Sequence, residues 1–387
     1  MVADISRYAG REQAYIKHYF LENYLEKLIH KTAGRFDHIA YVDGFSGPWQ
    51  NSDENFEDTS FGIALRALRT AKASWKTLGR DVRMSAYLVE KSASAHAKLA
   101  AIAARFPDIS IVTYNGDFVA TSPRLLADIP ADAFAFLFID PKGWRMRTQS
   151  ISGLLRRPNS EVVFNFMFDF INRAASMADP EEGLNELMPY GSWKAGLGAI
   201  DRRAPTASAQ RKAVLVAAFS ETLRRIGDYD YVAETPVMRP LVDRTLYSLI
   251  YATRKAAGIE VFRDCQIKTL QEQASVRGMA KVAQTQSRSG QGEMFASAGD
   301  MASDGIEEYL ASEREAAKQA LLASVPVQPE AVIYGEVWPQ ILSKHAVRKV
   351  DLNALAGSLR KSGGIVFPDW VPKKRVPDDE YRMSRPA

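Results

Sequence analysis

The chain has 387 residues, of which 46% are hydrophobic, 25% charged and 10% aromatic, and its formal net charge is +4. This is the composition of a globular protein large enough for two or more domains, and so small a net charge does not by itself demand a nucleic-acid partner. The single cysteine, Cys265, excludes an internal disulfide and a cysteine-rich metal site, and we expect no bound metal. Neither a signal-peptide pattern nor an 18-residue apolar segment occurs, so we expect a cytoplasmic protein.

The first two thirds of the chain alternate between helix-like and strand-like segments. Apolar residues at helical spacing predict helices over 11–31, from about residue 60, and over 92–105. Short apolar runs predict strands at 38–42, 84–90, 108–117, 134–139 and 161–170, and two late strands at 245–254 and 259–264, with a possible antiparallel hairpin around Gly258. This alternation predicts an α/β fold with a doubly wound, right-handed Rossmann-like sheet.

The last third changes character. Residues 271–300 are rich in Gly, Ser and Gln and predict a helix tail and a linker. A helix over 303–323, two short amphipathic helices, a glycine turn and a strand at 365–370 follow, which is the order of a winged helix-turn-helix. We therefore expect a Rossmann-like domain over 1–270, a polar linker over 271–300, and a helix plus a winged-helix domain over 301–387.

The segment FAFLFIDPKGWRM, residues 134–146, is the best chemical candidate. Its apolar run stops at Asp140, and open α/β sheets place their chemistry at the carboxyl ends of such strands. Asp140 would orient a nucleophilic amine or hydroxyl, or act as a base, while Pro141 fixes the backbone, Gly143 allows close approach and Trp144 stacks on a base. A plain strand-end turn with Trp144 in the core is the alternative.

Two other strand ends suggest a cofactor site. In VDGFSGPW, residues 42–49, Asp43 ends a strand, and Gly44 and Gly47 would let the backbone approach a ligand. Glu90 ends the next strand, where an acid often accepts hydrogen bonds from ribose hydroxyls, and Asp117 would accept from an adenine amino group. An ordinary β-turn, a surface glutamate and an Asx-type turn explain these segments equally simply. A Walker sequence is absent, which disfavours ATP hydrolysis.

Polar residues in two further regions are candidates for binding. Asn165 and Asp169 would face the cleft at Asp140, with Asn172 and Arg173 at its rim, although a buried structural network fits these four residues equally well. Basic residues of the expected winged helix predict phosphate contacts. They are Arg348, Lys349, Arg360 and Lys361, followed by Lys373, Lys374 and Arg375. A solvated basic face on a protein-binding winged helix is the alternative.

Taken together, these segments resemble the three-Cys-motif partner (TcmP) protein family. The resemblance covers most of residues 10–265 and rests on a helix bearing Lys17, on YVDGFSGPW, on EDTSFGIALRAL, on FIDPKGW and on NFMFDFINR, with LYSLIYATR also similar. The C-terminal part resembles the GMT-like winged helix attached to many members. Trp49 stands where the family has the last glycine of its first loop, and Thr59 and Phe61 replace the glycine and proline of a G-S-P sequence.

The resemblance implies a sheet like that of class I S-adenosylmethionine (SAM) methyltransferases and a partner with a three-cysteine motif, similar to radical-SAM iron–sulfur proteins. Two hypotheses follow. In the first, the chain is a SAM-dependent methyltransferase-like enzyme acting on nucleic acid, with Gly44 and Gly47 at the methionine end. In the second, it is a non-catalytic adaptor that binds the three-cysteine partner and recruits it to DNA. Trp49 slightly favours the second hypothesis.

Overall fold

The computed structural model describes residues 4–47, 56, 58–141, 143, 145–175, 181–190, 192–289 and 305–386. Contacts divide the chain into two compact units, Met1–Arg254 and Lys255–Ala387. We expected a division near residue 270, so the boundary falls earlier than the composition suggested. Trp49 and Trp144, for which the sequence predicts roles, lie outside the described residues.

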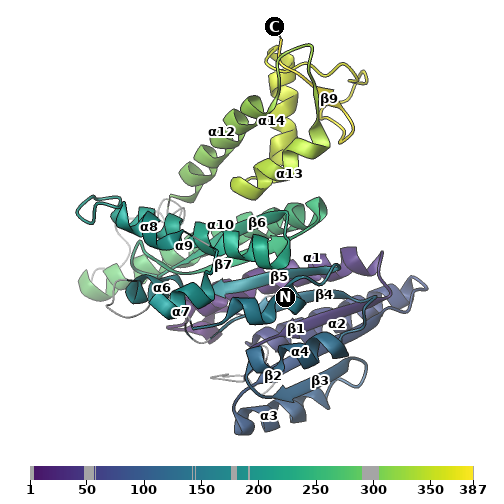
Figure 1. Ribbon diagram of the computed structural model, residues 1–387, viewed down its shortest axis with the longest axis vertical. Coiled ribbons are helices and arrows are strands. Elements are labelled where there is room, and N and C mark those ends of the chain that lie inside the picture. Colours follow the sequence, from purple (N-terminus) through teal and green to yellow (C-terminus); the bar gives the residue numbers. More distant parts are fainter. Residues whose placement is uncertain are drawn as a thin grey trace. The chain divides into compact units, whose positions relative to one another are not determined.

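The first unit is built on a seven-stranded sheet in the order β3-β2-β1-β4-β5-β7-β6 (Figure 1). Its strands are β1 His38–Asp43, β2 Arg83–Glu90, β3 Ser110–Asn115, β4 Phe134–Ile139, β5 Ser160–Phe166, β6 Tyr231–Met238 and β7 Thr245–Thr253. Strands β1 to β5 pair in parallel, and β7 runs antiparallel to both β5 and β6. The predicted α/β class and the mostly parallel Rossmann-like sheet are therefore confirmed.

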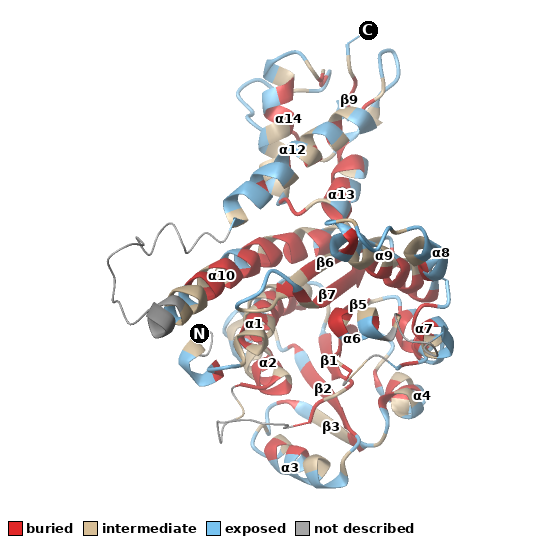
Figure 2. Cartoon of the chain, turned by 90° about the vertical axis from the view of Figure 1, so that its left-hand side faces the viewer, coloured by how far each residue is buried: buried red, intermediate tan, exposed pale blue. Residues whose placement is uncertain are grey.

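Strands β1 and β4 are buried along their whole length, because helices cover the sheet. Strand β1 is drawn in the colour of buried residues in Figure 2. Helices α4, α5 and α9 share one hydrophobic cluster with the strands, whereas α1 and α2 pack against each other and contact β1. The helical elements of this unit are η1 Ile5–Tyr8, α1 Glu12–Ala33, α2 Ser60–Thr77, α3 Ala93–Ala103, α4 Phe118–Asp128, η2 Thr148–Ile151, α5 Ser152–Leu155, α6 Phe168–Ala174, α7 Glu181–Leu187, α8 Trp193–Gly198 and α9 Ala207–Gly227.

One predicted strand is wrong and another is too long. Residues 259–264 belong to a helix, and the hairpin partner of β7 is β6, for which the sequence predicts no strand. Ile259 and Phe262 are buried three residues apart, which is helical and not strand spacing. The strand predicted over 161–170 ends at Phe166, because Phe168 and Ile171 bury one face of the short helix α6.

The second unit contains α10 Ala256–Ser289, α12 Ile306–Ser324, α13 Tyr334–Lys344 and α14 Lys349–Lys361, with the two-residue strands β8 Val332–Ile333 and β9 Arg382–Met383. Residues 271–289 continue α10 as the expected helix tail, so the polar linker expected over 271–300 does not begin at residue 271, and Ala274 and Val276 are buried. The rest of the expected linker, 290–300, lies outside the described residues. In place of the strand predicted at 365–370, Val366 forms an isolated bridge to Ser384.

Candidate functional site

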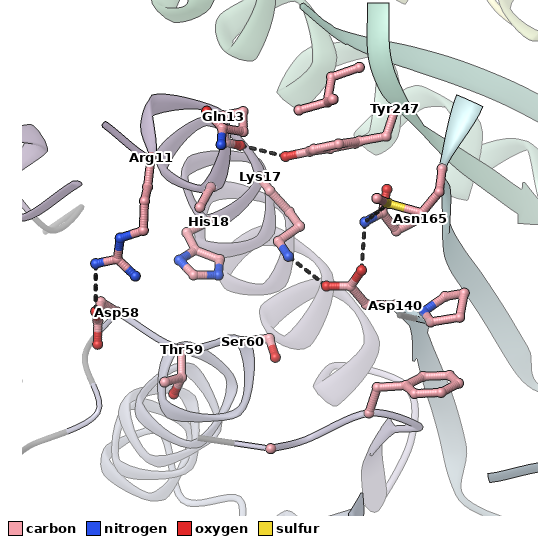
Figure 3. Close-up of a pocket in the computed structure, with 16 residues that line it drawn as sticks. Arg11, Gln13, Lys17, His18, Asp58, Thr59, Ser60, Asp140, Asn165 and Tyr247 are labelled. Atoms are coloured by element: carbon pink, nitrogen blue, oxygen red, sulfur yellow. Dashed lines mark hydrogen bonds and ion pairs between the residues drawn. The ribbon is translucent and has the colours of Figure 1, made fainter. Parts of the chain in front are cut away.

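A cavity of about 570 Å³ opens in the first unit at the carboxyl edge of the parallel strands (Figure 3). Its walls come from α1, the turn after β1, the start of α2, the end of β4, and strands β5 and β7. These segments are far apart in the chain. They meet because the register brings the ends of neighbouring parallel strands together: Asp43 pairs with Phe138, next to the end of β4.

Asp140 is the centre of the charged wall of this cavity. It follows β4 directly, and its two carboxylate oxygens have different partners (Figure 3). The Lys17 ammonium of α1 lies 2.5 Å from Oδ2, and the Asn165 amide of β5 donates to Oδ1 over 2.5 Å. The Lys17 and Asp140 side chains are only 17% and 21% exposed. Two charge-assisted hydrogen bonds in a partly desolvated setting fix the orientation of the carboxylate.

Asp43 lies behind the cavity and does not line it. Its buried carboxylate accepts hydrogen bonds from the Tyr41 hydroxyl at 3.0 Å, the Ser60 hydroxyl at 2.7 Å and the Phe45 N–H at 3.0 Å. Burial raises the pKa of Asp43 to about 6, and the three donors oppose this shift. Since Ser60 begins α2, the carboxylate ties the end of β1 to that helix, which Thr59 caps through the Gly62 N–H.

Another wall is formed by polar residues of α1 and of the segments that precede α1 and α2. The buried His18 Nδ1 lies 3.0 Å from the Tyr8 hydroxyl, and burial lowers the pKa of His18 well below its usual value, so the ring is neutral at pH 7. Arg11 and Asp58 form an ion pair of 3.4 Å. From β7, the Tyr247 hydroxyl donates to the Gln13 carbonyl at 2.5 Å.

Sequence reasoning assigned no role to most of these residues. Lys17 was noted through the family resemblance, and Asn165 as a possible neighbour of Asp140. His18 left a weak signal, a polar residue on the buried face of a helix between Ile16 and Phe20. Tyr247 left none, because an aromatic residue in a strand is ordinary.

The predicted ribose acceptor, Glu90, ends β2 as expected and is 1% exposed, so it is not a surface glutamate. One of its oxygens accepts from the Ser92 N–H at 2.6 Å. Asp117 caps α4, because its Oδ1 accepts from the Val119 and Ala120 N–H groups at 3.0 and 3.4 Å. This is the Asx-type alternative, and it leaves Oδ2, 3.4 Å from Lys91, as the outward atom.

The two glycines of the first turn differ in their surroundings. Gly47 lines the cavity. Gly44 is covered by the Phe118 ring, which a Cβ at Gly44 would approach to 2.9 Å, and its N–H donates to the Phe138 carbonyl. Gly44 is therefore required for packing against Phe118. Because the Phe118 ring covers this side of the turn, a ligand cannot approach the backbone of Gly44 from there.

The other predicted catalytic residue that the structure describes, Pro141, also lines the cavity. Gly143 has φ +101°, a conformation that glycine adopts without strain, so the loop after β4 requires this residue. Trp144 stays a prediction, because it lies outside the described residues. Asp169, Asn172 and Arg173 are on α6, and Asp169 is paired with arginines rather than turned into the cavity.

The predicted nucleic-acid residues lie at two ends of one helix. Arg348 and Lys349 are at the start of α14 and Arg360 and Lys361 at its end, about 18 Å apart at 1.5 Å per residue. Arg348 pairs with Asp351, Lys349 with Asp379, and the Arg360 guanidinium lies 4.2 Å from the centroid of the Trp370 ring. DNA binding by these residues stays a prediction.

Comparisons with known proteins assign no family. No family model and no curated protein matches this chain. Among solved structures, a Legionella pneumophila protein of the DUF519 family is 12% identical over 61% of this chain and 84% of its own, with a TM-score of 0.36. A protein from Thermobifida fusca described as a putative methyltransferase is 14% identical over 65% and 85%, with a TM-score of 0.32. Likenesses this low do not assign an activity.

The described residues contain no group of three or more His, Cys, Asp or Glu side chains arranged to hold a metal ion. In the same ranges, no helix combines the length and apolarity needed to span a membrane.

Proposed function

We propose that the first unit is a SAM-dependent methyltransferase-like enzyme whose acceptor binds in the cavity beside Asp140. The observation that carries this proposal is the Asp140 carboxylate, held through both oxygens by Lys17 and Asn165 where a parallel strand ends in a cavity of about 570 Å³. The strand order, with the single antiparallel strand β7 between β5 and β6, agrees with the class I sheet that the TcmP resemblance implied.

Methyl transfer depends mainly on positioning, because the acceptor must approach the sulfonium methyl group in line. The Asp140 carboxylate accepts a hydrogen bond from an N–H or O–H group of the methyl acceptor. This hydrogen bond orients the lone pair of the acceptor atom toward the methyl group. Lys17 and Asn165 keep the carboxylate from rotating, since each occupies one of its oxygens.

The cofactor, when bound, supplies an electrophilic methyl group. Of the five predicted cofactor residues, Gly47 borders the cavity and fits a contact to the methionine end. Glu90 ends the neighbouring strand β2 but is 1% exposed and does not line the cavity, so its contact to the ribose stays a prediction. Asp43 acts indirectly by tying the first turn to α2 through Ser60. Asp117 reaches an adenine only through its outward oxygen.

The adaptor hypothesis remains the second candidate, and one observation favours it. Asp43, Asp117 and the Gly44 side of the first turn are already used for internal hydrogen bonds and packing. A domain that had lost its cofactor would keep such contacts for stability. In this case the three-cysteine-motif partner would bind the first unit without methyl transfer.

For the second unit we propose a winged-helix fold. Strand β8, helices α13 and α14, the Val366 bridge and strand β9 follow one another in the order of that fold. In this proposal α14 is the second helix of the helix-turn-helix, and Arg348 and Lys361 at its two ends contact DNA phosphates. Ion pairing of Arg348 and Lys349 limits how strongly these residues contribute.

Substitution of Asp140 by alanine tests the catalytic proposal. We expect Asp140→Ala to abolish transfer of labelled methyl groups from SAM to extracted cellular nucleic acid, while SAM affinity stays within a few-fold of wild type. Asp37→Ala is the matched control, because Asp37 precedes β1 at the opposite edge of the sheet and is 79% exposed. Full transfer by a folded Asp140→Ala protein contradicts the proposal.

A further inference from the structure

A cluster of arginines lies on the first unit close to the cavity. Arg173 on α6 and Arg239 and Arg244 on the β6–β7 hairpin all approach the carboxylate of Asp169, whose side chain is 3% exposed. Arg239 Nη2 is 2.8 Å and Arg173 Nη2 3.7 Å from Oδ2, and Arg244 pairs with Oδ1. Three guanidinium groups thus surround one buried carboxylate, and each arginine side chain is itself at least 42% exposed.

Positive charge continues beyond this cluster. Arg211 of α9 donates to the Asn172 side chain over 2.8 Å, next to Arg173 in the sequence. Burial, and then the nearby charge of Arg202, lower the pKa of Arg211. Segments 168–175, 201–212 and 239–244 together carry seven basic and three acidic residues. The acids in these segments are Asp169, Asp201 and Asp243, and Lys212 is paired with Glu234 of β6.

The sheet places this cluster beside the cavity. Because β7 runs antiparallel to β5, with Ser248 opposite Phe166, the hairpin before β7 lies at the carboxyl end of β5. Arg244 precedes the cavity residue Leu246 by two positions, about 7 Å along a strand. On the other side, Met167 lines the cavity and Asp169 follows two residues later.

An exposed aromatic ring accompanies the arginines. Phe170 of α6 is 44% exposed, and the Arg173 guanidinium lies 4.7 Å from its ring centroid. Surfaces that bind single-stranded nucleic acids combine a cationic track for the phosphates with aromatic rings on which bases stack. We call Phe170, Arg173, Arg211, Arg239 and Arg244 the arginine surface.

We propose that the arginine surface binds the backbone of a single-stranded nucleic acid and that a neighbouring base enters the cavity toward Asp140. Phe170 stacks on a base, and the guanidinium groups contact phosphates bidentately. A base inside a duplex cannot reach an enclosed group such as Asp140, which is why a single strand fits. This inference rests on the proposed function, since it names the substrate class of that site.

Fluorescence anisotropy of the full-length protein with labelled 20-nucleotide single strands of RNA and of DNA tests the proposal, and the two probes distinguish the kinds of strand. Titrations run between 50 and 300 mM salt, and SAM binding is measured separately by calorimetry. Each phosphate contact contributes about 0.7 to the slope of log affinity against log salt. Arg239→Ala/Arg244→Ala should therefore reduce the slope by about 1.4.

That double variant leaves Asp169 with fewer partners, so Arg173→Ala/Arg211→Ala, which keeps the two shorter ion pairs of Asp169, is the second test and should give a similar loss. Phe170→Ala should weaken binding on the order of tenfold with little change in slope. Arg35→Ala/Arg83→Ala is the matched control, because Arg83 starts β2 and Arg35 precedes β1, at the opposite edge.

The outcomes separate this inference from the proposed function. If the affinity for single-stranded RNA and DNA and its salt slope are unchanged in both arginine double variants, the proposed role of the arginine surface is overturned, even if SAM binds. Strand binding that falls as expected, in a protein that gives no heat with SAM, supports the surface and overturns methyl transfer. Equal losses in the Arg35/Arg83 control also overturn the inference, because they show an effect of net charge alone.

Discussion

The Lys17–Asp140 pair is the most specific feature of the site, and a double-mutant cycle measures it. We consider Lys17→Met, Asp140→Asn and the double variant. Lys17→Met keeps most of the side-chain volume and removes the charge that lies 2.5 Å from Oδ2. Asp140→Asn replaces one acceptor oxygen by an N–H donor. Because both neighbours, Lys17 and Asn165, are donors, this N–H group then faces another donor.

The magnitude follows from burial and geometry. A fully exposed ion pair contributes at most about 1 kcal/mol, whereas losing a partner of a buried charged group costs about 1–3 kcal/mol. With side chains that are 17% and 21% exposed, the pair lies between these limits. We expect each single variant to lose about 1–2 kcal/mol and the coupling energy to be about 1–2 kcal/mol.

Hydrogen exchange followed by mass spectrometry is the appropriate assay, because a chain with two compact units does not unfold in one two-state transition. Peptides from α1 and β4 report the local free energy of opening. Lys31→Met, an exposed lysine in the last turn of the same helix, is the matched control and should change opening by less than about 0.5 kcal/mol. A coupling energy below about 0.3 kcal/mol refutes the reasoning.

Four further predictions concern the cofactor, the buried acid and the second unit. Glu90→Ala should weaken SAM binding by about 1.5–3 kcal/mol in calorimetry, and unchanged affinity excludes a ribose contact. Because burial raises the pKa of Asp43 from 3.8 to about 6, the folded state favours its protonated form. The stability that this preference contributes is complete below pH 4 and falls by up to about 3 kcal/mol as the pH rises to 6. Asp43→Asn should therefore flatten the pH dependence of the free energy of opening of β1 and α2, measured by hydrogen exchange between pH 4 and 7, and parallel wild-type and variant profiles contradict this. A fragment of residues 305–387 should fold alone, as judged by circular dichroism, and be more stable than one of residues 325–387, which lacks the contact of Glu313 with the Ala346 N–H. If that unit binds duplex DNA, Arg360→Ala/Lys361→Ala should reduce the salt slope by nearer one than two, because Arg360 already packs on Trp370; a loss of two shows that both residues contact phosphates.

The central strands were readable from the sequence because they are buried on both faces. Residues 134–139 form an uninterrupted apolar run, and β4 has those bounds. The edge strand β6 was hidden, since Glu234 and Pro236 interrupt its apolar pattern, and an edge tolerates both. The strand predicted over 259–264 was wrong, because a short apolar segment fits a strand and a buried helix equally well.

The candidate site was predictable only where one strand end carried it. Asp140 stood out because an acid follows a buried run, and Glu90 for the same reason. Lys17, the partner of Asp140, is 123 residues away from it in the chain, and no local sequence pattern connects the two residues. Asp117 shows the limit of such reasoning, because a polar residue after a strand caps the next helix as readily as it binds a ligand.

Calorimetric titration of the full-length protein with SAM and with its demethylated product tests the central claim most directly. The proposal that the cavity beside Asp140 serves methyl transfer predicts binding of SAM with a micromolar or tighter dissociation constant. The absence of both heat and a thermal shift at millimolar SAM contradicts that proposal and leaves the adaptor as the better description of the chain.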